Sequence, residues 1–62
     1  MKFYEIWLYT SESGWFSKHL TSIKQTAMDV AKESTHFGDV LMTKVVERVD
    51  VEDRGEMIAL FA

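Results

Sequence analysis

Few residues of this sequence have types and spacings that could do chemistry. Nucleophilic catalysis needs an activated serine, cysteine or lysine beside a positioned base. The chain has no cysteine and only two histidines, His19 and His36, and neither lies in a recognisable catalytic motif. The hydroxyl side chains fall mainly where turns and helix caps are expected, and the three glycines stand singly rather than in a phosphate-binding loop. We therefore expect the protein not to be an enzyme.

The two histidines also offer little for metal binding. They are far apart in the sequence, and a site built on them would need carboxylates that no spacing brings to the same place. We expect both histidines to be partly exposed, and we expect no bound metal and no other cofactor.

Aromatic residues near the N-terminus are the first candidates for binding. The run from Lys2 to Thr10 lacks glycine and proline and is rich in aromatic residues, which favours a strand. Alternation would point Tyr4, Ile6 and Leu8 to one face. The opposite face would carry Phe3, Glu5, Trp7 and Tyr9, joined by Trp15. One helix can cover only one face, so aromatic anchors for a protein interface would stay exposed, unless loops, the C-terminal strand or a second copy covers them.

An acidic segment is the second candidate surface. Its acidic residues are Glu47, Asp50, Glu52, Asp53 and Glu56, against Arg48 and Arg54. Glu52 and Asp53 could dock on a basic site of a nucleic-acid-handling protein. Alternatively, the segment is a solvated turn that resists aggregation of strand edges. Neutralising both residues would then change stability by no more than about 0.5 kcal/mol.

A helix is predicted between the two halves of the chain. Ser22 and Gln25 have the spacing of a capping box, which predicts a helix running to about Ser34. Its apolar stripe would consist of Ile23, Ala27, Val30 and Ala31. Phe37 and Gly38 are typical of a helix end, with Gly38 in the left-handed conformation and Phe37 folded over the core.

Strand signals fill the rest of the chain. A turn at 11–14 joins the first strand to an alternating segment at 15–20, and a turn at 52–55 joins strands at 40–49 and 57–62. The order ββαββ predicts an α+β fold, in which one helix packs on one face of a four-stranded antiparallel sheet. No linker or repeat interrupts the chain, so residues 1–62 are expected to form a single domain.

Composition limits the environment and the partners. The hydrophobic fraction of 47% and the charged fraction of 27% are those of an ordinary globular domain. The lack of cysteine fits a reducing cytosol, and no segment is typical of a signal peptide or a transmembrane helix. We therefore expect a cytoplasmic protein without a membrane partner. The net charge of −3 favours a protein partner over nucleic acid.

The segment from Ile23 to Val46 resembles the centre of a known group of inhibitors. It has inward-facing alanines, a helix ending at Phe37-Gly38 and a strand opening at Val40-Leu41-Met42. This pattern is similar to that of small phage-encoded inhibitors, including some type I anti-CRISPR proteins. The ββαββ order also resembles phage proteins that block host RNA polymerase or neutralise host toxins. The resemblance implies a cytosolic inhibitor that occupies a partner's surface. No basic patch matches the one that some anti-CRISPR proteins use, so no binding residue is transferred.

The leading hypothesis is a non-catalytic, phage-encoded inhibitor or regulator that binds a bacterial host or defence protein. Its predicted binding residues are Phe3, Trp7, Tyr9, Trp15, Glu52 and Asp53. One alternative is a homodimeric structural or assembly component joined through the aromatic face. Another is a single-stranded nucleic-acid binder that stacks bases on the exposed rings.

Overall fold

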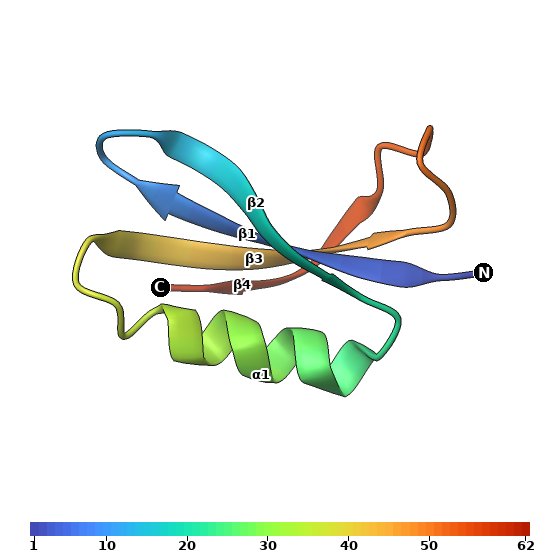
Figure 1. Ribbon diagram of the computed structural model, residues 1–62, viewed down its shortest axis with the longest axis horizontal. Coiled ribbons are helices and arrows are strands. Elements are labelled where there is room, and N and C mark those ends of the chain that lie inside the picture. Colours follow the sequence, from blue (N-terminus) through green and yellow to red (C-terminus); the bar gives the residue numbers. More distant parts are fainter.

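The predicted element order is confirmed by the computed structural model, which describes residues 1–62 (Figure 1). Two strands, β1 and β2, precede the single helix α1, and two more, β3 and β4, follow it. Their bounds are Phe3–Thr10 for β1, Gly14–Thr21 for β2, Lys24–Ser34 for α1, Val40–Arg48 for β3 and Glu56–Phe61 for β4.

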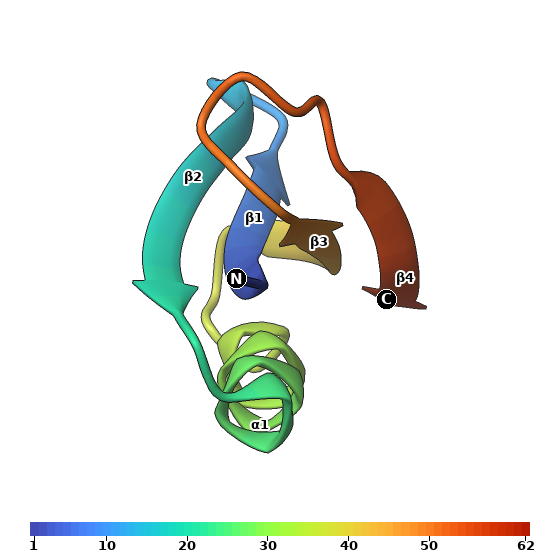
Figure 2. The ribbon, with the colours of Figure 1, turned by 90° about the vertical axis from the view of Figure 1, so that its right-hand side faces the viewer.

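The four strands form one antiparallel sheet in the order β2-β1-β3-β4. Strands β1 and β3, which are far apart in the sequence, therefore pair at the centre of the sheet, and β2 and β4 are its edges. Helix α1 lies across one face of this sheet, and the loop between β3 and β4 lies on the opposite side (Figure 2). The chain thus has a helix-covered face and a face without a helix, which we call the open face.

The core lies between the sheet centre and the helix. Tyr4, Ile6 and Leu8 of β1 are buried there, as strand alternation predicts. Helix α1 contributes Ala27 and Ala31, which are completely buried, and these short side chains let the helix approach the sheet closely. The buried Thr43 hydroxyl of β3 donates a hydrogen bond of 2.8 Å to the carbonyl oxygen of Ala31. This bond fixes the last helical turn against the sheet centre.

The helix start differs from the predicted capping box. Ile23, not Ser22, is the N-cap residue, and no side chain caps the helix. The backbone N–H of Ile23 is instead bonded to the Thr21 hydroxyl oxygen at the end of β2. Because Ile23 has an extended conformation, its side chain leaves the packed stripe and is 59% exposed.

The helix end differs from its prediction as well. Gly38 does not have a positive φ, and Phe37 is 50% exposed rather than folded over the core. The backbone N–H groups of His36 and Phe37 bond to the carbonyl oxygens of Glu33 and Ser34 at 3.1 and 3.3 Å. The Thr35 hydroxyl also donates to the Lys32 carbonyl oxygen at 2.7 Å, so no left-handed glycine is needed there. The Phe37 ring instead contacts the Lys18 ammonium, 4.4 Å from its centroid.

Candidate binding face

Three aromatic rings gather at one end of the open face. Trp7 and Tyr9 point there from β1, and Trp15 of β2 lies directly opposite Tyr9 in the strand register. The Tyr9 and Trp15 rings meet edge to face, with centroids 5.2 Å apart. All three side chains are partly buried rather than fully exposed. We call these three residues the aromatic cluster.

Lys44 lies within reach of two of these rings. It pairs with Trp7 across the β1–β3 register, and its ammonium is 4.3 Å from the Trp15 centroid and 5.7 Å from the Trp7 centroid. It forms no salt bridge within the chain. Cation–π contacts with both indoles hold its charge at the surface of the aromatic cluster. This residue was not among those predicted to bind, because only the register of β3 against β1 brings it there.

Exposed aliphatic side chains extend the open face to both edges of the sheet. Leu20 of β2 pairs with Glu5, and Leu60 of β4 pairs with Lys44, so each shares the face of its partner. They are 57% and 53% exposed. Met57 of β4 is paired with Val46 of β3 and is similarly exposed. The face therefore has an apolar floor wider than the aromatic cluster.

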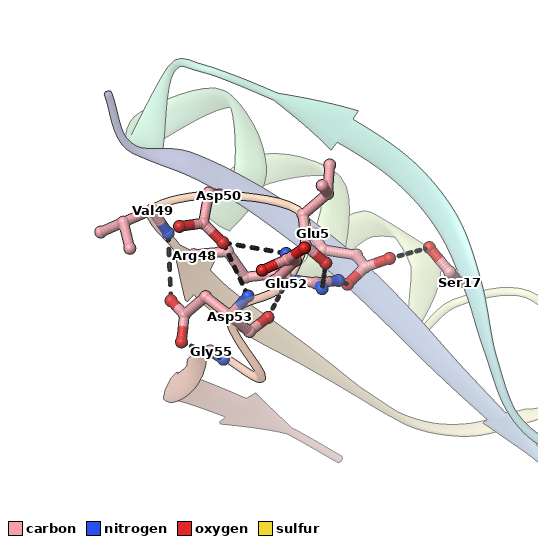
Figure 3. A network of polar contacts seen from close by, with 9 residues as sticks. Glu5, Ser17, Arg48, Val49, Asp50, Glu52, Asp53 and Gly55 are labelled. Carbon is pink, nitrogen blue, oxygen red and sulfur yellow. Dashed lines mark hydrogen bonds and ion pairs between the residues drawn. The ribbon is translucent and has the colours of Figure 1, made fainter.

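The loop of residues 49–55, here the acidic loop, folds over the other end of the open face (Figures 2 and 3). Arg48 holds it there. Its Nε donates to the Asp53 carbonyl oxygen at 2.9 Å and its Nη2 to the Val51 carbonyl oxygen at 3.0 Å. Nη1 forms an ion pair of 2.8 Å with Glu5 Oε1, and the Ser17 hydroxyl donates to Glu5 Oε2. These contacts join β1, β2 and β3 to the loop.

Glu5 is an acidic residue on an otherwise apolar part of β1, and its side chain is only 10% exposed. Burial alone would raise the pKa of this carboxyl group. The hydrogen bonds from Ser17 and Arg48 and the charge of Arg48 together lower it by more than burial raises it, so the pKa of Glu5 lies below its usual value. The carboxylate is therefore an internal partner for Arg48 and not a free charge of the face.

Two aspartates stabilise the acidic loop from within. The Asp53 carboxylate accepts hydrogen bonds of 3.1 Å from the backbone N–H groups of Gly55 and Val49, and these bonds lower its pKa. Asp50 Oδ1 accepts two bonds of 2.8 Å from the N–H groups of Glu52 and Asp53. Asp53 therefore organises the turn through its backbone partners, whereas the side chain of Glu52 is exposed and forms no such bond.

The predicted binding residues thus lie on one side of the molecule. Phe3, Trp7, Tyr9 and Trp15 belong to the open face, and Glu52 and Asp53 belong to the loop that folds over it. Phe3 lies at the loop end, where its ring centroid is 5.8 Å from the Arg48 guanidinium carbon. The sequence suggested two separate surfaces, and the fold brings them together into one face with an apolar floor and an acidic rim.

The two histidines lie in different segments of the chain. His19 is on β2, His36 follows α1, and both are exposed. The structure contains no group of three or more histidine, cysteine or acidic side chains arranged for a metal ion, and it contains no pocket. Helix α1 lacks the length and apolar character that crossing a bilayer requires.

Comparison with known proteins found no matching family model, no similar curated protein and no similar solved structure. The resemblance to phage-encoded inhibitors therefore stays a prediction.

Proposed function

We propose that this chain is a non-catalytic protein-binding domain that inhibits or regulates its partner by occupying the partner's surface. The observation that supports this function is the folded-back acidic loop, which lies on the same side of the sheet as the aromatic cluster. In the specific form that the sequence resemblance suggests, the domain is a phage-encoded inhibitor and the partner is a bacterial host or defence protein.

The chemistry of the open face favours a protein partner. Tryptophan and tyrosine side chains bury large areas at interfaces and often dominate the binding energy. The Tyr9 and Trp15 rings contact each other and Lys44 contacts both indoles, so binding would immobilise few additional side-chain rotamers. We infer a partner with an apolar patch, a carboxylate or carbonyl group that meets Lys44, and a basic group that meets the acidic loop.

Single-stranded nucleic acid is the rival ligand for the same face, since aromatic rings on a sheet can stack bases. Two features oppose it. The Lys44 ammonium lies 4.3 Å from the Trp15 centroid, where a base would have to stack. The acidic loop also faces the same side, and the chain carries a net charge of −3, so phosphate groups would be repelled.

Affinity capture tests this function. The purified chain is immobilised and exposed to bacterial lysate beside two variants, Trp15→Ala on the open face and Ile23→Ala at the helix start. Ile23 is a matched control because it is apolar, 59% exposed and part of the helix layer rather than the open face. We expect one stoichiometric protein that binds the wild type and Ile23→Ala and is lost with Trp15→Ala.

Two outcomes would contradict the proposal. A captured protein that Ile23→Ala loses and Trp15→Ala keeps would move the binding site away from the open face. Micromolar binding of single-stranded oligonucleotides at low salt, weakening steeply as salt is added, would favour the nucleic-acid rival instead.

A further inference from the structure

Strand β4 is an edge of the sheet with no neighbour on its outer side. The backbone N–H and C=O groups of alternate residues on that side are therefore unpaired within the chain, and such an edge is a template for another strand. Apart from Glu56 at its start, β4 contains only apolar residues, and it has no proline. This edge is chemically suited to accept an extended backbone.

The other edge, β2, is protected in a way that β4 is not. Both edge strands have a bulge, which shifts the register opposite β1 in β2 and opposite β3 in β4. In β2 the additional residue is Lys18, which is exposed, and a charged side chain at an edge opposes strand addition. In β4 the additional residue is Ile58, which packs against the core and presents no charge. One edge is therefore blocked and the other is open.

We propose that β4 pairs antiparallel with β4 of a second copy, so that two chains form one continuous eight-stranded sheet. An antiparallel strand pair has a two-fold axis perpendicular to the sheet, so a strand can always pair with its own copy in this way. Because only one edge is open, pairing closes at a dimer and does not continue into a fibre.

Charge at the ends of β4 also favours a second copy in this orientation. Glu56 begins the strand, and Phe61 ends it with the Lys32 ammonium 5.9 Å from its ring centroid. Antiparallel pairing brings the Glu56 end of one chain beside the Phe61 end of the other, where Lys32 supplies the opposite charge. At each end of the pair, Lys32 of one chain would therefore face Glu56 of the other.

The dimer goes beyond the proposed function and leaves its surface free. A two-fold axis perpendicular to the sheet keeps the two helices on one side and the two open faces on the other. The assembly would present two aromatic clusters in the same direction, which allows bivalent binding to a partner that repeats its own site. The homodimer considered from the sequence, in contrast, would bury the aromatic cluster.

Sedimentation of the full chain over a range of concentrations tests the dimer directly. The informative variant is Leu60→Lys on β4, and its matched control is Leu20→Lys on β2, since both leucines lie on edge strands and the same face with exposures of 53% and 57%. We expect the wild type and Leu20→Lys to be dimers at tens of micromolar. Leu60→Lys should weaken dimerisation at least about tenfold, because it places a charged side chain opposite Met57 of the second copy, and a charge on an edge strand opposes strand addition.

Amide hydrogen exchange provides a second readout that needs no variant. Raising the protein concentration should slow exchange of outward-facing N–H groups in β4 and leave those in β2 unchanged. A wild type that is monomeric throughout would overturn the proposal, and so would species larger than a dimer. Dimers that Trp7→Ala dissociates and Leu60→Lys does not would assign the interface to the aromatic cluster. None of these results depends on capture of a partner, so the dimer and the proposed function can fail separately.

Discussion

Arg48 connects more segments of this molecule than its place at the end of β3 suggests. Its guanidinium meets the buried Glu5 carboxylate of β1 and two carbonyl oxygens of the acidic loop. Each of its three nitrogen atoms has a protein acceptor. A planar group with several donors in fixed directions is suited to this position, and lysine could not make the same set of bonds. The open face thus has its loop end fixed by one side chain.

Removing this side chain should destabilise the fold. In Arg48→Ala the Glu5 carboxylate keeps the Ser17 hydroxyl but loses its charged partner, and two loop carbonyls lose their donors. We expect the free energy of unfolding in urea to fall by about 1.5–3 kcal/mol, the range for hydrogen bonds to charged groups. Arg54→Ala is the control, because Arg54 is exposed and forms no side-chain hydrogen bond or ion pair, and it should change stability by less than about 0.5 kcal/mol. Equal effects of the two variants would contradict this role of Arg48.

The lowered pKa of Glu5 predicts how stability depends on pH. A carboxyl group whose pKa is lower in the folded chain than in the unfolded chain stabilises the fold fully above the unfolded value, about 4.5 for this glutamate. That contribution is lost as the pH falls through the folded pKa. We expect the free energy of unfolding to decrease on acidification below about pH 5.

Urea unfolding of Glu5→Gln across the same pH range is the measurement that isolates this residue. The variant should be less stable at neutral pH and should lose less stability on acidification. Some pH dependence should remain, because Asp53 also has a lowered pKa and acts in the same direction. A pH profile parallel to that of the wild type would show that the Glu5 ion pair does not stabilise the fold.

At the scale of elements, the acidic loop owes its path to Gly55. This residue has φ of +80°, and a Cβ atom built on it would lie 2.9 Å from the Glu47 carbonyl oxygen and still closer to side-chain carbons of Val46 and Arg48. Gly14, in the turn between β1 and β2, has a similar φ of +70° with nothing within 4 Å of such a Cβ atom. Substitution of Gly14 would therefore test the cost of the left-handed conformation alone, and substitution of Gly55 would add the cost of steric crowding.

Alanine at each glycine should give different losses. Gly14→Ala should cost about 1–2 kcal/mol, the strain of a left-handed residue with a side chain. Gly55→Ala should cost a further 1–3 kcal/mol, about the range for overpacking, because Val46 and Arg48 must move. Thermal or urea unfolding measures both. If Gly14→Ala is the more destabilising of the two, the loop is not packed against β3 as described.

How far the elements could be predicted depends on which interactions set them. The β1 faces followed from alternation alone, because a strand has a period of two whatever surrounds it. The helix ends did not. At the start, the Thr21 hydroxyl accepts from the Ile23 N–H, and the bond expected between Ser22 and the Gln25 N–H is absent. At the end, the N–H groups of His36 and Phe37 bond to the Glu33 and Ser34 carbonyl oxygens in place of the expected Gly38 cap. Several residues could satisfy the same backbone groups, and the tertiary context selects among them.

At the scale of the whole molecule, the site depends on contacts between distant parts of the chain. The aromatic residues of the face could be predicted because three of them lie on one strand. Lys44 could not, since it meets Trp7 only because β3 pairs with β1, and propensities do not determine strand order. The position of the acidic loop over the open face could not be predicted either, because it requires the bond between Arg48 and Glu5, 43 residues apart.

The proposed function requires that one face of the sheet stay free of the helix, and the fold provides this open face. Both tryptophans, Trp7 and Trp15, lie on the open face, and the sequence has no other tryptophan. Every indole signal from this protein therefore reports on the proposed binding surface.

Fluorine NMR of the chain labelled with 5-fluorotryptophan tests the binding face most directly. The spectrum should contain two resonances, which a Trp7→Phe variant assigns. On addition of the unlabelled captured partner to one equivalent, we predict that the Trp7 and Trp15 resonances both shift or broaden, because both rings become part of the interface. A partner that binds stoichiometrically and leaves both resonances unchanged would contradict the assignment of function to the open face.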